Sequence, residues 1–170
     1  DVALDAALGV GPAPNYVQER FPATDLIAGW EAKGQRRLDG GGLVIFNSGY
    51  SPTELRKFRA PAPGSYRIRV SAYGFQSAEK PITFRLYSGN FNVGGKTKLL
   101  GHFDVPPDKA KVIEVTAYLE SRGDSLKLMP YGTIPWQNKA DDYMGSGVAV
   151  EWIEVEGPLE AKVWPPVTRD

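Results

Sequence analysis

The sequence contains no cysteine among its 170 residues. This absence excludes a disulfide framework, a thiolate metal site and a cysteine nucleophile in one step. Histidine occurs once, at His102, between Gly101 and Phe103. With a single histidine and no cysteine, the usual Ser/His/Asp, Cys/His and zinc constellations cannot be assembled. We therefore expect His102 to pack or to cap, not to catalyse.

Net charge and long apolar runs are also absent. Twenty basic and twenty acidic residues cancel, and the basic ones are scattered, so no field gathers phosphates and nucleic acid is not an expected partner. No apolar run approaches the roughly 20 residues that span a bilayer, so no membrane span is expected. No segment between Phe21 and Leu159 keeps a helical period for three turns, which excludes nucleotide folds built on βαβ units.

What the sequence does contain is turn residues and alternating strands. The 19 glycines and 14 prolines form small clusters, which suits many turns between short strands. Residues 66–72, 82–87 and 113–120 alternate apolar with polar side chains, as half-buried strands do. Less regular strand candidates are residues 26–30, 43–46, 54–59, 99–105, 126–129 and 148–155. About nine strands result, and they predict an all-β fold, an antiparallel β-sandwich.

The last candidate strand, residues 148–155, departs from simple alternation. Val148, Val150 and Trp152 are apolar on one phase, and Ala149, Ile153 and Val155 are apolar on the other. A β-bulge or burial on both faces of the sheet would explain this pattern, and the sequence alone does not choose between them.

The chain is predicted to hold one domain with two flanking segments. Residues 1–20 combine the end of a preceding helix, closed by Gly9, with a proline-containing linker. Residues 21–159 form the β-sandwich, and residues 160–170, with Trp164-Pro165-Pro166, form an exit linker. The first residues carry no leader, so we expect any signal peptide to lie upstream of this fragment.

The acids and glycines bear on three kinds of chemical site. A glycosidase needs two carboxyl groups on opposite sides of a sugar, and the adjacent Asp141 and Asp142 cannot straddle a bond. No cofactor is expected, although loop acids could hold a structural calcium ion; no recognisable calcium loop is present. The clusters at 40–42 and 94–95 lack the Gly-Lys-Ser/Thr ending of a phosphate loop, so we interpret them as turns.

Aromatic residues beside amides provide the strongest functional signal. Candidate loops carry Tyr50, Phe75 and Phe91 next to Asn, Gln or Ser, and the loop 130–147 carries Trp136 and Tyr143. A sugar ring offers an apolar C–H face that stacks on an aromatic plane and a rim of hydroxyls that pairs with polar side chains. Long loops in compact domains are often functional. The predicted ligand-binding residues are Tyr50, Trp136, Asn138, Asn47, Tyr143 and Asp142.

A family resemblance rests on two segments. Residues 64–72 read Gly-Ser-Tyr-Arg-Ile-Arg-Val-Ser-Ala after Pro61-Ala62-Pro63, and residues 147–155 read Gly-Val-Ala-Val-Glu-Trp-Ile-Glu-Val. They resemble the "p-x-G-x-Y" core and the terminal strand of jelly-roll carbohydrate-binding modules of the family 6, 35 and 36 type, over most of residues 25–157. The resemblance implies a jelly-roll sandwich and a ligand cleft among the loops at one end. By position, Tyr50, Trp136 and Asn138 would line that cleft.

The two ends of the chain resemble a more particular frame. The stretch Leu4-Asp5-Ala6-Ala7, the pair Gly157-Pro158 and the Trp-Pro-Pro at 164–166 are similar to the borders of a module in planctomycete surface proteins that combine planctomycete-specific and cytochrome-c-like domains. This resemblance implies a secreted or cell-surface parent with neighbouring domains as partners. The chain has no Cys-x-x-Cys-His, so it cannot hold a c-type haem itself.

Three functional hypotheses follow. The first is a non-catalytic module that binds a polysaccharide or oligosaccharide on loop aromatics. The second is a structural module whose aromatics dock on neighbouring domains of its parent. The third is a carboxylate-based glycoside hydrolase, for which we expect no turnover.

Overall fold

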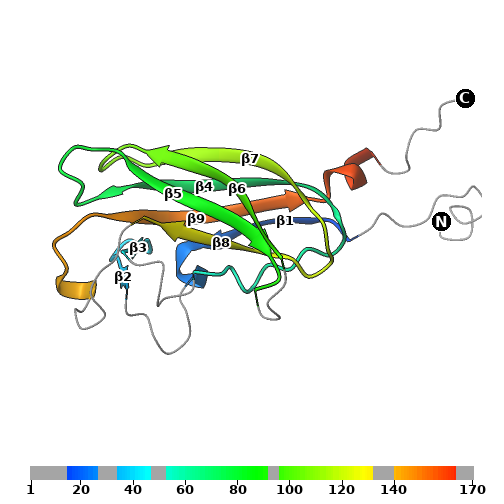
Figure 1. The fold of residues 1–170 in the computed structure, drawn as a ribbon, viewed down its shortest axis with the longest axis horizontal. Helices are drawn as coiled ribbons and strands as arrows, with labels where there is room; N and C mark the ends of the chain where they lie inside the picture. The colour runs from blue at the N-terminus through cyan, green and yellow to red at the C-terminus, as the bar shows by residue number, and fades with distance from the viewer. Residues whose placement is uncertain (1–14, 27–33, 47–52, 92–95, 132–139, 164–170) are drawn as a thin grey trace, which may run out of the picture.

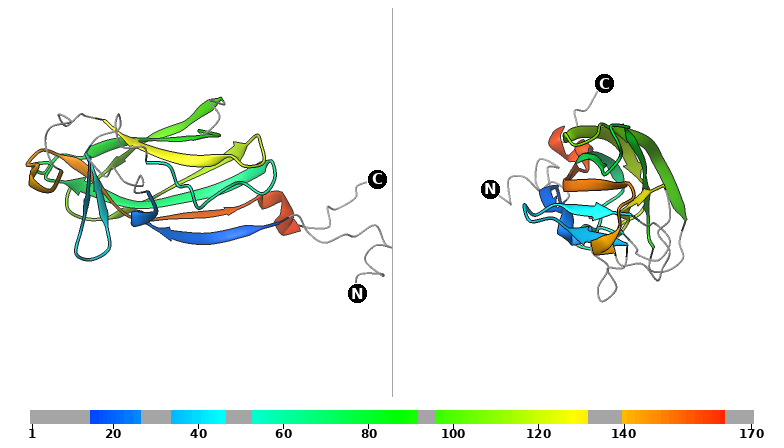
Figure 2. Two further views of the ribbon diagram at one scale, coloured as in Figure 1. Left: turned by 90° about the horizontal axis from the view of Figure 1, so that it is seen from below. Right: turned by 90° about the vertical axis from the view of Figure 1, so that its left-hand side faces the viewer.

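The computed structural model describes residues 15–26, 34–46, 53–91, 96–131 and 140–163. Within them, nine strands form two antiparallel sheets that pack face to face (Figures 1 and 2). Sheet A has the order β2-β3-β9-β4-β7, with β1 also paired to β9, and sheet B has the order β6-β5-β8. The strands are β1 Val17–Pro22, β2 Gln35–Arg37, β3 Leu43–Ile45, β4 Gly64–Phe75, β5 Ile82–Gly89, β6 Thr97–Val105, β7 Lys111–Leu119, β8 Ser125–Pro130 and β9 Gly147–Gly157. The 3-10 helices are η1 Ala23–Leu26, η2 Ala140–Asp142 and η3 Leu159–Val163.

The main core lies between the two sheets. Alternation along β4 places Tyr66, Ile68 and Val70 inside with no exposed surface, while Arg67 and Arg69 face outward. Side chains from β3, β5, β8 and β9 complete this core, which also receives Phe21, Leu26, Leu55 and Phe58. The predicted all-β sandwich of about nine strands is confirmed.

The structure differs from the predicted strands at three places and leaves a fourth mostly undescribed. The prediction of a strand at 54–59 is wrong, because Glu54 makes only an isolated bridge to Lys127 and the chain then turns, with the Phe58 amide bonded to the Leu55 carbonyl. Of the candidate 26–30, Leu26 ends η1, and the rest lies outside the described residues. The strands that the sequence analysis missed are β1, which lies mostly in the stretch predicted as a linker, and the three-residue β2. The predicted helical segment near the N-terminus also lies outside the described residues.

Both explanations offered for the unusual apolar pattern of β9 are correct. In the pairing of β4 with β9, Ser71 lies opposite Trp152 and Ala72 lies opposite Val150, so Glu151 is an extra, bulged residue. The face of sheet A that points away from the main core is also covered at one end, where a second apolar cluster forms. Its buried members are Val44, Phe46, Ala140 and Ala149, with Leu38, Tyr73, Phe75 and Tyr143 packed against them.

Elsewhere the outer face of sheet A carries a ladder of ion pairs that makes stability depend on pH. Arg69 bonds Glu154 (Nη1–Oε1, 2.9 Å) and Glu114 (Nε–Oε1, 2.6 Å), and Arg20 bonds Glu154 from the other side. The Arg69 hydrogen bond, and after it that of Arg20, holds the pKa of the Glu154 carboxyl below its ordinary value. A depressed folded-state pKa contributes stability above the unfolded pKa of about 4.3 and loses it as the pH falls through the folded pKa.

We therefore expect Arg69→Gln to reduce the loss of unfolding free energy that the protein shows as the pH falls. Urea unfolding at a series of pH values should show the wild type losing more of its free energy of unfolding on acidification than the variant does. Arg122→Gln is the matched control, since Arg122 is exposed and forms no ion pair with a carboxylate in the described residues. The same acid dependence in Arg69→Gln as in the wild type would contradict this assignment.

Candidate functional site

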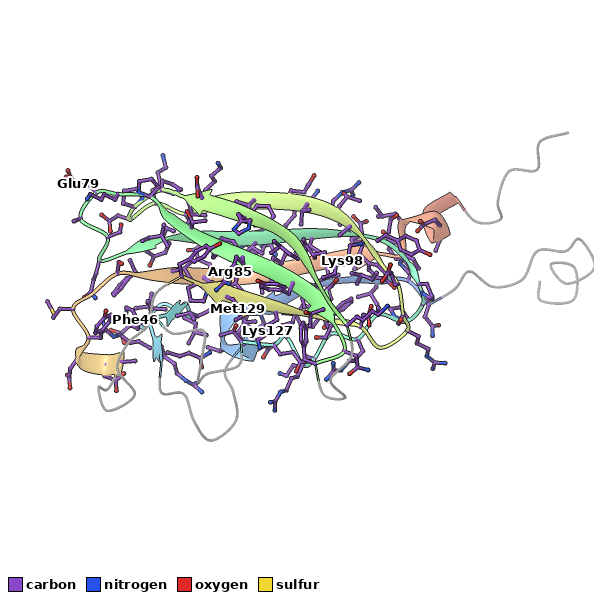
Figure 3. The ribbon with its side chains drawn as sticks, viewed as in Figure 1. Phe46, Glu79, Arg85, Lys98, Lys127 and Met129 are labelled. Carbon is purple, nitrogen blue, oxygen red and sulfur yellow. The ribbon has the colours of Figure 1, made fainter. Side chains whose placement is uncertain are left out.

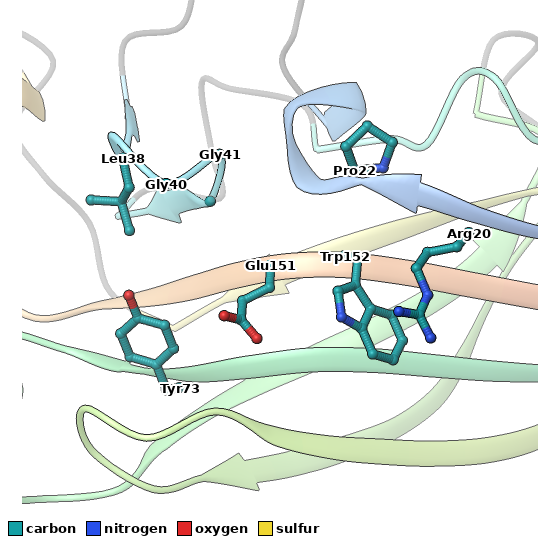
Figure 4. A pocket seen from close by; sticks show the side chains of 9 residues that line it. Arg20, Pro22, Leu38, Gly40, Gly41, Tyr73, Glu151 and Trp152 are labelled. Atoms are coloured by element: carbon teal, nitrogen blue, oxygen red, sulfur yellow. The ribbon is translucent and has the colours of Figure 1, made fainter.

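A pocket of about 660 Å³ opens on the outer face of sheet A (Figure 4). It lies where the partner of β9 along one edge changes: β1 ends with Pro22 opposite Trp152, and β3 begins with Leu43 opposite Val150. Proline at the end of a strand has no N–H to continue a ladder, which suits a strand end. Between these two partners, no strand of the described residues pairs with Glu151 along this edge of β9. The lining residues are Arg20, Pro22, Leu38, Gly40, Gly41, Gly42, Tyr73, Glu151 and Trp152.

The bulge in β9 determines which side chains enter the pocket. In a regular strand, Glu151 and Trp152 would point to opposite faces. Because Glu151 is the extra residue, both side chains lie on the outer face, and Ile153 returns to the core with 1% exposure. Bulges commonly re-aim side chains in this way beside functional sites. The same irregularity that keeps the core intact therefore supplies the pocket with a carboxylate and an indole.

A glycine turn forms the opposite wall. The amide of Leu38 bonds the carbonyl of Gly42 (2.8 Å), and the amide of Gly41 bonds the carbonyl of Leu38 (3.0 Å). Gly41 has φ +97°, a conformation that side chains with a Cβ rarely adopt. Figure 4 shows this turn facing a row of side chains along the sheet, in which Glu151 lies between Tyr73 and Trp152.

Trp152 forms one end of that row and is half-buried. The guanidinium carbon of Arg20 lies 3.8 Å from the centroid of its ring. Arg20 is held there by Glu154, with Nη2 and Oε2 3.0 Å apart. A guanidinium stacked on indole gains from cation–π attraction. The ring is therefore fixed in orientation, and Arg20 forms the rim of the pocket beside it.

Tyr73 and Glu151 bring hydrogen-bonding groups to the same surface. The Ser71 hydroxyl donates to Oε1 of Glu151 over 2.6 Å, which fixes the carboxylate. Burial, followed by the negative charges of Glu151 and Asp108, raises the pKa of the Tyr73 hydroxyl above its usual value. That hydroxyl stays protonated and can both donate and accept. The pocket thus combines two aromatic rings with a fixed acceptor and a hydroxyl.

The loop site predicted from the sequence lies mainly outside the described residues. This applies to Tyr50, Trp136, Asn138 and Asn47. Of the other two, Asp142 is exposed in η2, and Tyr143 is half-buried with its ring edge-on to Phe46 at 5.1 Å between centroids. Tyr143 thus packs on the second apolar cluster, which shares Leu38 and Tyr73 with the pocket. The two surfaces adjoin.

The segment that leads into β9 is firmly attached to the sandwich. Arg36 donates to the carbonyls of Ala140 (2.6 and 2.8 Å) and Tyr143 (2.7 Å). Gln76 donates from Nε2 to the carbonyls of Tyr143 and Gly145, both over 2.9 Å. These bonds satisfy carbonyls that no sheet partner reaches, and they fix the position of η2 and of the turn after it.

Comparisons with known proteins bear on the fold. No family model and no curated protein matches the chain. Solved structures do match, among them the C-terminal CBM6 of LamC, a marine laminarinase from Zobellia galactanivorans (TM-score 0.52, 14% identity, 84% of this chain and 100% of that chain). The second CBM6 of Cellvibrio mixtus lichenase 5A, in complex with cellotriose, matches with a TM-score of 0.51 and 13% identity over 82% of this chain and 96% of that chain. The chain has the jelly-roll fold of carbohydrate-binding modules.

A third match extends the likeness to another family of modules. The CBM36-1 domain of a multidomain xylanase from the hindgut metagenome of Trinervitermes trinervoides aligns with a TM-score of 0.56 and 8% identity, over 83% of this chain and 98% of that chain. The resemblance to family 6 and 36 modules is thereby confirmed for the jelly-roll fold. At such identities the likeness concerns the fold and not the ligand.

The single histidine, His102, lies in β6 of sheet B, whereas the pocket lies on the outer face of sheet A. Nδ1 of His102 is 2.6 Å from the hydroxyl of Tyr131, and the two rings are nearly parallel. Tyr131 also covers the guanidinium of Arg85 at 4.4 Å. Arg85, Met129 and Lys127 lie along β5 and β8 on the outer face of sheet B (Figure 3). His102 is exposed and contacts the Tyr131 side chain, and its expected non-catalytic role stays a prediction.

Metal and membrane features are absent from the ranges that the structure describes. No group of three or more His, Asp or Glu side chains there is arranged to hold a metal ion. None of the helices in the same ranges has the length and apolar character of a membrane span.

The sequence analysis missed the pocket because it searched for aromatics in loops. Trp152 lies in a strand, and the interpretation of residues 148–155 left open which way it points. The apolar character on both phases was the available signal, since a bulge followed by Trp places the ring outside. Arg20 was missed for a different reason, because its strand was interpreted as a linker.

Proposed function

We propose that this chain is a non-catalytic carbohydrate-binding module whose ligand occupies the pocket on sheet A. The observation that carries the proposal is the row of Tyr73, Glu151 and Trp152 that lines the pocket on the outer face of sheet A. Ligand pockets of roughly 300–1,000 Å³ with aromatic walls and few polar groups are typical of small-molecule sites. The jelly-roll fold shared with known carbohydrate-binding modules supports the same conclusion.

Each side chain of the pocket has a role in holding a sugar. The apolar face of a pyranose stacks on the exposed surface of Trp152 or Tyr73. The Glu151 carboxylate, fixed by Ser71, accepts hydrogen bonds from ring hydroxyls, and the Tyr73 hydroxyl donates or accepts one. Because a sugar exchanges good bonds to water for each bond to protein, the affinity is modest.

The loop residues Tyr50, Trp136, Asn138 and Asn47, with Tyr143 and Asp142, are proposed to extend this binding surface. The support is their mixture of rings and amides, together with the contact between Tyr143 and the apolar cluster beside the pocket. A chain of sugars that leaves the pocket toward η2 would reach them. A structural calcium ion among the loop acids stays a prediction.

The parent protein is proposed to be secreted or exposed on a planctomycete cell surface. The support is the resemblance of the terminal motifs to those of planctomycete surface proteins. The described ends of the chain also meet at one end of the sandwich, where Val17 pairs with Gly157, while η2 lies at the other end (Figure 1). Neighbouring domains would then attach away from η2 and the proposed loop surface.

We expect Trp152→Ala to weaken glycan binding by about thirtyfold, since a central aromatic contact is worth about 2 kcal/mol. A panel of soluble polysaccharides in affinity electrophoresis identifies a ligand, and calorimetric titration with its oligosaccharides measures the change. Tyr118→Ala is the matched control, because Tyr118 is a 49% exposed aromatic on β7 of the same sheet, outside the pocket. Trp136→Ala is titrated in parallel to test the loop surface.

The outcomes separate the hypotheses. Wild-type affinity in folded Trp152→Ala would contradict the pocket, and a loss confined to Trp136→Ala would transfer the site to the loops. A folded wild type that binds no glycan of the panel would reject the function and favour the module that docks on neighbouring domains. Release of reducing sugar, abolished in Asp142→Asn, would instead establish the hydrolase.

A further inference from the structure

Glu151 differs from the other glutamates on the outer face of sheet A. Glu154 is paired with Arg20 and Arg69, Glu156 with Arg67, and Glu114 with Arg69. Glu151 accepts a hydrogen bond from the neutral Ser71 hydroxyl, and no Lys, Arg or His of the described residues forms an ion pair with it. Among the described residues, no cation contacts this pocket carboxylate.

The cation in the described pocket lining, Arg20, does not balance that charge. Arg20 is stacked on Trp152 at 3.8 Å and paired with Glu154 at 3.0 Å, so its guanidinium is already engaged. Figure 4 shows it on the far side of Trp152 from Glu151. Along the turn that closes the pocket, the exposed Arg37 and Asp39 carry opposite charges. Of the two charged side chains that line the pocket, Arg20 is paired with Glu154, while Glu151 has only the neutral Ser71 hydroxyl as a partner among the described residues.

Two aromatic rings flank this carboxylate, with Tyr73 on one side and Trp152 on the other. A carboxylate beside aromatic rings is a chemically suitable site for an ammonium group, which gains a charge-assisted hydrogen bond and cation–π attraction together. We infer that the pocket selects a saccharide with a free amino group, such as an oligomer of glucosamine, whose ammonium binds Glu151 while the sugar ring stacks on Trp152 or Tyr73.

This inference rests on the proposed function and makes it more specific. A neutral sugar can also use Glu151 as an acceptor, but a hydrogen bond with both partners charged is substantially stronger than one between a hydroxyl and a carboxylate. An N-acetylated sugar loses the charge and adds bulk at the same position. The order of affinity at the pocket is therefore amino sugar first, then the neutral sugars.

The test is calorimetric titration with trimers of glucosamine, N-acetylglucosamine and glucose, at a pH where the sugar amine is protonated. The wild type should bind the glucosamine trimer about tenfold more tightly than the other two. Glu151→Gln keeps the side-chain shape and should remove this preference, so that the glucosamine and glucose trimers bind with similar affinity. Glu120→Gln, which changes an exposed glutamate outside the pocket, should keep the wild-type preference.

Two results would overturn the inference alone: glucose trimer bound at least as tightly as glucosamine trimer, or a preference that persists unchanged in Glu151→Gln. In both cases binding that is lost in Trp152→Ala would leave the glycan-binding function standing. A wild type that binds none of the three trimers, nor any glycan of the panel, would reject the function itself. Preference for a trimethyllysine peptide over all three trimers would also overturn it, since the pocket would then recognise protein.

Discussion

Tyr66→Ala is expected to lower the free energy of unfolding by about 3–5 kcal/mol, the usual cost of truncating a buried aromatic residue. Tyr66 has no exposed surface, and its ring meets Phe58 edge-on at 5.8 Å, while Phe58 in turn meets Phe21 at 6.4 Å. Its hydroxyl donates to the carbonyl of Ala62 over 2.7 Å. The Tyr66 ring thus packs β4 against the segment between β3 and β4, which contains Phe58. Through Phe58 it is also linked to the end of β1, which contains Phe21.

Tyr66→Phe separates the ring from the hydroxyl. It keeps the aromatic packing and loses the two hydrogen bonds of the hydroxyl with Ala62, one donated to the carbonyl and one accepted from the amide over 3.4 Å, so its cost should be about 1–2 kcal/mol. Urea denaturation followed by tryptophan fluorescence measures both variants against the wild type. Equal destabilisation by the two substitutions would show that the hydroxyl, and not the packing of the ring, is what this position contributes.

The role of Tyr66 also explains the "p-x-G-x-Y" pattern of the sequence in physical terms. A Cβ on Gly64 would lie 2.6 Å from Cβ of Pro158, so a larger residue there would displace the chain that follows β9. The glycine of the motif is needed because two backbone segments approach closely at Gly64. The tyrosine is needed because its buried ring and hydrogen-bonded hydroxyl hold β4 in place.

Alternation of apolar and polar residues predicted the strands that have one buried face and one solvent-exposed face. For β4, β5 and β7 the period of two along the sequence was sufficient, because burial on a single face produces that period. β1 was missed because prolines on either side suggested a linker, although Pro22 only ends the strand. The prediction of a strand at 54–59 was wrong because these residues form a turn, across which the buried Glu54 is paired with Arg59 at 2.9 Å.

The pocket was harder to predict than the fold, because it depends on residues distant in sequence. Its lining includes Arg20 of β1, Leu38 of the turn after β2, Tyr73 of β4 and Trp152 of β9. These residues come together only because β1, β3 and β4 all pair with β9. The resemblance to known modules directed attention to loop aromatics. It contained no information about a gap between two partner strands or about a bulge opposite that gap.

Deletion of Glu151 is expected to have the largest effect on the protein. Without the extra residue, the two halves of β9 cannot both keep their register with β4, because a shift of one residue moves every side chain to the other face. Either Val148 and Val150 or Ile153 and Val155 leave the core, where these four side chains are at most 1% exposed. Each exposed side chain costs about 1.5–3 kcal/mol, and polar groups enter the core in their place.

The deletion variant should therefore lose at least about 4 kcal/mol, a large part of the stability of an ordinary domain. Glu151→Ala, which keeps the residue count and the bulge, should stay within about 1 kcal/mol of the wild type, because the side chain of Glu151 is exposed. Chemical denaturation with circular dichroism measures both. A deletion variant with wild-type stability would mean that β9 can pair without the bulge, and the outward position of Trp152 would then need a cause other than the extra residue.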